Sequence, residues 1–308
     1  MKSGANTNLT IHPQAEKIRH QNRQLQTSLA GLIVERDDLK HSVLPRITAE
    51  YQIKLGALEW RVFQLDCEAR AFLRRIEMAQ AALNRGEEPN HQNIETEIEI
   101  EFAAWREQSK QQARKIKAAQ ERADVPTLSY AESRELQTLY RRLALALHPD
   151  IVKNPDERQR KLWLQAAEAY RCGDLEILRT ICLLVSSDAE TLADVSANEN
   201  LSVLEILNNR NIELKQTCEK LLDEITEIKT TAPYILRETL DDETELEKRQ
   251  NMLQEQIESL REKRFQLTKH WAEIMRFAAD RENVRISDEP PDIFAADDED
   301  WAEIIYDL

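Results

Sequence analysis

The chain has 308 residues, of which 32% are charged and only 5 are glycine, and its formal net charge is −15. This composition favours long charged helices over sheets and turns, in about two domains. Phosphate backbones repel an acidic chain, which disfavours a nucleic-acid role, and no apolar run approaches the roughly 20 residues that span a bilayer.

The cysteines and the first residues indicate the cellular compartment. The four cysteines, Cys67, Cys172, Cys182 and Cys218, lie far apart and form no CxxC pair. We therefore expect reduced thiols and no zinc site. Residues 1–20 lack the apolar core of a signal peptide. Together these features predict a cytoplasmic protein without a membrane segment, a metal or another cofactor.

Residues 1–14 are polar and typical of a disordered tail, and residues 15–124 predict a coiled-coil helical region. In this region apolar residues recur in alternating steps of three and four, as heptads do. Proline lacks an amide proton and clashes with the preceding turn, so we expect one helix to end before Pro45.

A second helix is expected from about Arg46 to Asn84, a turn at residues 86–89 and a third helix over about 93–122. Short connections favour antiparallel neighbours. The region is therefore predicted to form a long helical hairpin or a three-helix coiled coil.

Residues 125–187 predict a small helical domain. Ser129 and Glu132 have the spacing of a capping box, which begins a helix that runs to about Leu147. A loop, a second helix to about residue 171 and a short apolar helix follow. Gly173 is the expected C-terminal cap of the second helix.

After a linker at residues 188–200, heptads return over residues 201–280. Pro233 divides them into two seams of similar length, which predicts an antiparallel coiled-coil hairpin. Asn211 lies in the first seam, where a lone polar residue can fix register. Residues 281–308 hold ten acidic residues against two arginines and predict a disordered acidic tail.

One motif in the small domain carries chemical information. The segment from Tyr140 to Asp150 reads YRRLALALHPD. Pro149 restricts His148 to extended geometry, so the helix must end there and should display His148 and Asp150 beside an exposed basic strip. Alone, the triplet is more typical of an ordinary helix stop followed by a turn aspartate.

This segment resembles the DnaJ-type J domain. That family's second helix reads Tyr, two basic residues and Leu-Ala, and ends in His-Pro-Asp. The loop with Lys153 and Asn154 resembles the family's basic loop, and Trp163, Ala166 and Ala169-Tyr170 fit the pattern of its third helix. The order and the spacing of all three parts agree with the family.

The resemblance implies a co-chaperone that is not itself an enzyme. Its loop and basic face would dock on a DnaK-type ATPase and stimulate ATP hydrolysis, which locks a protein client into the chaperone. The residues implied in this docking are His148, Pro149, Asp150, Tyr140, Arg141, Arg142, Leu145 and Lys153. Residues 127–187 carry nine basic and eight acidic groups, a basic excess that suits an acidic partner surface.

The resemblance covers only about 60 of the 308 residues. The family's first helix, with its Tyr-x-x-Leu-Gly pattern, does not precede Ser129, and Lys117–Ala123 are a candidate to replace it. There is no Gly/Phe-rich linker and no cysteine-rich zinc module. The chain is therefore not a full-length DnaJ.

The predicted fold is all-α, with elongated helical hairpins or coiled coils on both sides of a small J-domain-like unit. We expect residues 201–280 to target the chaperone to its client and to be dispensable for ATPase stimulation. The alternative is a structural coiled-coil scaffold whose degenerate J-like module docks without stimulating the ATPase. Periodicity does not show whether the coiled coils pair within one chain or between chains, so a homo-oligomer stays open.

Overall fold

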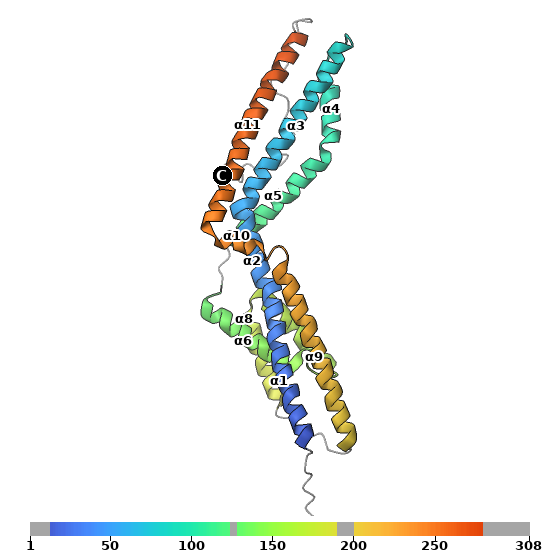
Figure 1. Cartoon of the computed structure of the whole chain (residues 1–308), viewed down its shortest axis with the longest axis vertical. Coiled ribbons are helices and arrows are strands. Elements are labelled where there is room, and N and C mark those ends of the chain that lie inside the picture. The colour runs from blue at the N-terminus through green and yellow to red at the C-terminus, as the bar shows by residue number, and fades with distance from the viewer. Residues whose placement is uncertain (1–12, 124–127, 190–199, 280–308) are drawn as a thin grey trace, which may run out of the picture. The chain divides into compact units, whose positions relative to one another are not determined.

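The computed structural model describes residues 13–123, 128–189 and 200–279 (Figure 1). Helices account for 89% of these residues, and none of them lies in a strand. The prediction of an all-α protein is confirmed. The predicted tail at 281–308, most of the tail at 1–14 and most of the linker at 188–200 lie outside the described residues.

The described helices belong to two compact units. Unit 1 contains Met1–Pro45 and Pro126–Ile235, and unit 2 contains Arg46–Val125 and Leu236–Leu308. Each unit therefore combines two segments that lie far apart in the sequence.

The expected helix break before Pro45 is wrong. Helix α1 (Pro13–Asp38) leads into a π-helical turn, η1 (Leu39–Val43), and α2 (Leu44–Tyr51) follows at once. Pro45 is the second residue of α2. The wider π turn loosens the backbone just before the proline ring would meet the carbonyl of the preceding turn. The chain therefore passes Pro45 without leaving helical geometry.

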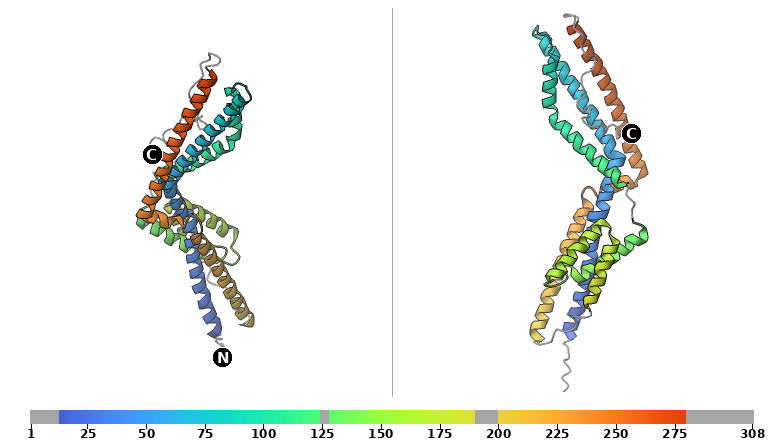
Figure 2. Two further views of the ribbon diagram at one scale, coloured as in Figure 1. Left: turned by 45° about the horizontal axis from the view of Figure 1, so that its top comes forward. Right: turned by 180° about the vertical axis from the view of Figure 1, so that it is seen from behind.

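In unit 1, α1 pairs with α9 (Asn200–Thr230) along two apolar seams. The hydrogen bonds between these helices join residues separated by 185 to 194 positions, from Asn22–Leu207 to Glu35–Lys229. A nearly constant separation means that the two helices run parallel. Figure 2 shows α1 and α9 side by side in both of its views.

The second unit contains a helical hairpin. A π turn, η2 (Gln52–Gly56), leads into α3 (Ala57–Asn84), and a turn at Arg85–Gly86 reverses the chain into α4 (His91–Glu101) and α5 (Ala103–Ala123). Phe102 interrupts the predicted third helix between α4 and α5. Contacts between the two arms grow in sequence separation from 20 to 60 positions, as an antiparallel pair requires.

Helix α11 (Glu243–Ala279), which follows the short α10 (Leu236–Asp241), packs along α3. Arg264 donates to Glu68 at 2.6 Å and Gln250 donates to the Lys54 carbonyl at 3.0 Å, both across 196 positions. The constant separation shows that α11 also runs parallel to its partner.

The predicted antiparallel hairpin within residues 201–280 is therefore wrong. Its two helices belong to different units, and each packs against the apolar seam of an N-terminal helix. Helix α9 packs against α1, and α11 packs against α3. A heptad pattern specifies an apolar stripe on a helix but not the helix that covers it.

Candidate functional site

The candidate site lies in unit 1 and is built on α6 (Tyr130–Leu147), α7 (Glu157–Cys172) and α8 (Leu175–Ala189). Ser129 and Glu132 form the predicted capping box at the start of α6, and Asp156 and Gln159 form another at the start of α7. Gly173 ends α7 in the left-handed conformation that its C-cap position requires. The local helix boundaries predicted for this segment are confirmed.

Helices α6 and α7 form an antiparallel hairpin with a core of aromatic and aliphatic side chains. The ring of Tyr140 stacks on that of Tyr170, with centroids 4.0 Å apart, and on that of Trp163, at 5.2 Å. Helix α8 closes this core. The buried members of the core are Leu136, Tyr140, Leu143, Leu147, Leu162, Ala166, Ala169, Tyr170, Leu178, Ile181 and Cys182.

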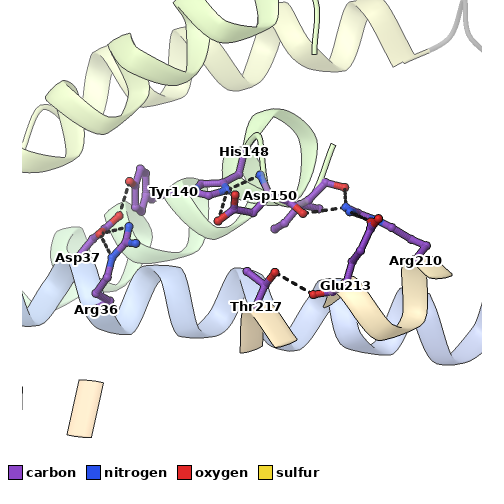
Figure 3. A network of polar contacts seen from close by, with 9 residues as sticks. Arg36, Asp37, Tyr140, His148, Asp150, Arg210, Glu213 and Thr217 are labelled. Carbon is purple, nitrogen blue, oxygen red and sulfur yellow. Dashed lines mark hydrogen bonds and ion pairs between the residues drawn. The ribbon is translucent and has the colours of Figure 1, made fainter. Parts of the chain in front are cut away.

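Tyr140 belongs to this core and not to the surface. Only 1% of the residue is exposed, and its hydroxyl donates a hydrogen bond of 2.7 Å to Oδ2 of Asp37 on α1 (Figure 3). Burial, with the neighbouring Asp37 carboxylate, raises the pKa of Tyr140. The side chain cannot contact a partner directly, so its expected role in docking is reduced to supporting α6.

His148 is also buried, contrary to the expectation that the motif displays it. Its ring packs edge-on against Trp163, with centroids 4.7 Å apart. Its Nδ1 accepts a hydrogen bond of 3.1 Å from the Asp150 amide. Burial is the main cause that lowers the pKa of His148. The imidazole is therefore a neutral acceptor that shapes the loop from inside.

The turn after His148 is closed by its own backbone. Pro149 holds His148 in an extended conformation, with φ −64° and ψ 131°, and α6 ends there. The amides of Ile151 and Val152 both donate to the His148 carbonyl, at 2.9 and 2.8 Å. The side chain of Asp150 is about half exposed, and its Oδ2 lies 3.9 Å from Nδ1 of His148 (Figure 3).

The remaining residues implied in docking are exposed. They are Arg141, Arg142, Leu145, Pro149 and Lys153, which occupy the last two turns of α6 and the loop after it. Arg141 is additionally in contact with α1, because its Nη2 lies 3.4 Å from the Thr27 carbonyl and beside Gly31. The basic strip predicted from the sequence is therefore present, with α1 along one border.

Lys117–Ala123, the candidate for an additional helix beside this segment, belong to unit 2, and the helix that packs against α6 in unit 1 is α1. A second core joins α1 and α9 to the end of α6 and to the loop. Ala144 and Ile151 lie in it against side chains of both coiled-coil helices. Its buried members are Leu29, Ala30, Ile33, Ala144, Ile151, Leu214, Cys218 and Leu221.

One residue that contacts the loop was not predicted from the sequence. Arg210 of α9 donates from Nη2 to the carbonyls of Asp150, at 2.7 Å, and Ile151, at 2.9 Å (Figure 3). The nearest signal in the sequence was its neighbour Asn211, which marked this turn of the seam as polar. Nothing local to Arg210 indicates a loop about 60 residues away.

Among the residues that the structure describes, no group of His, Cys, Asp and Glu side chains could hold a metal ion. No described helix is both long and apolar enough to cross a membrane. Comparison with protein-family models, with curated proteins and with solved structures gives no match for this chain.

Proposed function

We propose that residues 128–189 form a J-domain-like unit that docks on a DnaK-type chaperone and stimulates its ATP hydrolysis. The observation that carries the proposal is the hairpin of α6 and α7, in which Pro149 follows the end of α6, the Asp150 carboxylate is about half exposed, and the preceding helix exposes Arg141 and Arg142. The chain acts as a co-chaperone in this proposal, and the catalytic groups belong to its partner.

The geometry divides the motif between contact and support. Arg142, Leu145, Asp150 and Lys153 are exposed and would meet the partner, whereas His148 is buried and would hold the loop. Cationic side chains on an otherwise acidic protein favour an acidic partner surface and speed the encounter with it. Stimulation should therefore weaken as the ionic strength rises.

The other helices supply a scaffold in this proposal. The pair α1 and α9 supports the loop, and unit 2 presents long charged helices that are suited to a protein client or assembly. Delivery of a chaperone to such an assembly in the cytoplasm remains the function that best fits a J-like unit joined to coiled coils.

The test is single-turnover ATP hydrolysis by a DnaK-type chaperone in the presence of the full chain. We expect stimulation by the natural chain and its loss in Asp150→Asn, because the exposed carboxylate is the group that the loop presents. Glu157→Gln is the matched control. It removes one exposed carboxylate from the start of α7 without touching the loop, and it should stimulate like the natural chain.

A different result supports the scaffold alternative, which the burial of His148 favours. If the natural chain binds the chaperone but leaves its ATPase rate unchanged, the J-like unit is a docking module only. If the chain neither binds nor stimulates the chaperone, the proposal is wrong.

A further inference from the structure

We propose that Arg210 of α9 is a positioning residue that holds the His148–Asp150 loop in the conformation read by the chaperone. The inference rests on the proposed function and adds a part of that site outside the J-like segment. Its observation is a single guanidinium that caps two successive carbonyls of the loop.

Arg210 is well placed to fix the backbone. Its Nη2 bonds both the Asp150 and the Ile151 carbonyl, and its Nη1 lies 3.1 Å from Glu213 one turn further along α9. The side chain is only 19% exposed, so its hydrogen bonds are partly shielded from water. Bonds from a charged donor are stronger than neutral ones, and a rigid guanidinium fixes direction as well as distance.

Other contacts hold the same loop residue. The Ile151 side chain is 4% exposed and packs in the core shared with α1 and α9. The side-chain amide of Gln26 on α1 donates from Nε2 to the Ile151 carbonyl, at 3.5 Å. The loop thus lies against both helices of the coiled coil, and the hydrogen bonds from Arg210, at 2.7 and 2.9 Å, are shorter than the one from Gln26.

The register of the coiled coil sets the position of Arg210. Its neighbour Asn211 is buried and donates to Oδ1 of Asn22 at 2.8 Å, while Asn22 donates to the Leu207 carbonyl at 3.0 Å. A shift of α9 along α1 would break this pair and carry the guanidinium away from the loop. Arg210 therefore reaches the loop only in the register that the two asparagines select.

Without the guanidinium, two carbonyls lose a charged donor and the loop should sample other conformations. If only a fraction of molecules holds the competent loop, the apparent affinity for the partner falls by that fraction. The maximal stimulated rate at saturation is retained, because the competent loop still carries Asp150. This distinguishes Arg210 from Asp150, whose loss lowers the maximal rate.

The experiment compares Arg210→Ala with Arg210→Lys and with Lys215→Ala in the full chain. Lys215→Ala removes an exposed cation from the same helix, away from the loop. We expect Arg210→Ala to raise the concentration for half-maximal ATPase stimulation about tenfold, with an unchanged plateau, as the loss of a charged hydrogen bond would do. Arg210→Lys should restore part of the effect, and Lys215→Ala should match the natural chain.

Amide hydrogen exchange in the free protein supplies the second readout. The amides of Ile151 and Val152, which close the turn, should exchange about tenfold faster in Arg210→Ala than in the natural chain. Unchanged exchange with weaker docking would mean that Arg210 contacts the partner directly, which overturns the positioning role.

The two proposals fail in different ways. Equal half-maximal concentrations for Arg210→Ala and the natural chain would overturn the role of Arg210 while the proposed function stands. Absence of stimulation by every variant, including the natural chain, would overturn the proposed function and this role with it, even if exchange at Ile151 rises.

Discussion

At the scale of single residues, His148 shows how the motif combines packing with presentation. The imidazole lies against Trp163 and accepts a hydrogen bond from the Asp150 amide, while the Asp150 carboxylate stays about half exposed. A buried neutral ring in this position makes the loop sensitive to proton binding. The reason is that protonation would place a charge in the core and remove the acceptor at Nδ1.

This arrangement predicts an acid-sensitive loop. Burial lowers the pKa of His148 below its ordinary value of 6.5 more than the nearby Asp150 and Asp37 carboxylates raise it, and Arg36 lowers it further. Below pH 6.5 the unfolded chain therefore binds a proton at this position more readily than the folded chain. The contribution to stability is fully present above pH 6.5 and is lost as the pH falls toward the lowered pKa.

Urea unfolding at pH 7.5 and 5.5 measures this effect. The natural chain should lose more stability between the two values than His148→Gln, which cannot titrate, although the variant starts from lower stability because it loses the contact with Trp163. The other titratable groups are common to both chains, so they cancel in the comparison. Equal losses in the two chains would contradict a buried neutral His148.

The residues of the site differ in how far their sequence positions reveal them. The spacing of Leu136, Tyr140, Leu143 and Leu147 predicts their common buried face, and the structure confirms it. The same spacing could have removed Tyr140 from the set of docking residues. The burial of His148 and the contacts of Arg210 depend on Trp163 and on the register of α9, and no local pattern encodes either of them.

At the scale of helices, the sequence predicts seams and caps but not partners. Heptad steps identified the apolar faces of α1, α3, α9 and α11, and the capping residues located the ends of α6 and α7. The pairing differed from the prediction because an unpaired seam fits any helix with a matching stripe. Pro45 was read as a stop because a single sequence does not show that a π turn precedes it.

The buried asparagine pair offers a test of how α1 chooses α9. In Asn211→Leu, Oδ1 of Asn22 loses its donor in an apolar seam while Nδ2 keeps the Leu207 carbonyl, and we expect a loss of about 1–3 kcal/mol in the free energy of unfolding. In the double variant Asn22→Leu, Asn211→Leu, two apolar side chains replace the pair. Its stability should return to that of the natural chain or exceed it.

Specificity is the property that the double variant should lose. A single polar pair commonly fixes the register and the number of helices in a coiled coil. Light scattering should therefore detect mixed oligomers in the double variant and not in the natural chain or in the matched exchange of the pair to two glutamines. A double variant as unstable as the single one would show that the two asparagines are not coupled.

At the scale of the whole molecule, chain order does not coincide with the compact units. The predicted regions 15–124 and 201–280 each contribute one helix of a parallel pair to unit 1 and one to unit 2. The J-like segment is not an insert between two independent coiled coils, because α1 and α9 share a core with it. Removing residues 201–280 as a block would therefore disturb both units at once.

This organisation changes the expected result of truncation. A chain that ends after Thr230 keeps α1, α6 to α9 and Arg210, and loses α10 and α11, which pack in unit 2. A chain that ends after residue 199 also loses α9, which uncovers the seam of α1. It also removes the Arg210 hydrogen bond to the loop and the α9 side of the core around Ile151. We expect the first truncated chain to retain ATPase stimulation, and the second to lose most of it.

Hydrogen exchange should follow the same division. The amides of Ile151 and Val152 should stay protected in the chain that ends after Thr230 and exchange faster in the chain that ends after residue 199. The chain that ends after Thr230 uncovers only the seam of α3, whereas the chain that ends after residue 199 uncovers the seams of both α3 and α1. The longer chain therefore controls for the cost of exposing the α3 seam. If the shorter chain stimulates the chaperone as well as the longer one does, residues 128–189 support the loop by themselves. The coiled coil of unit 1 would then not be needed to hold the loop in its active conformation.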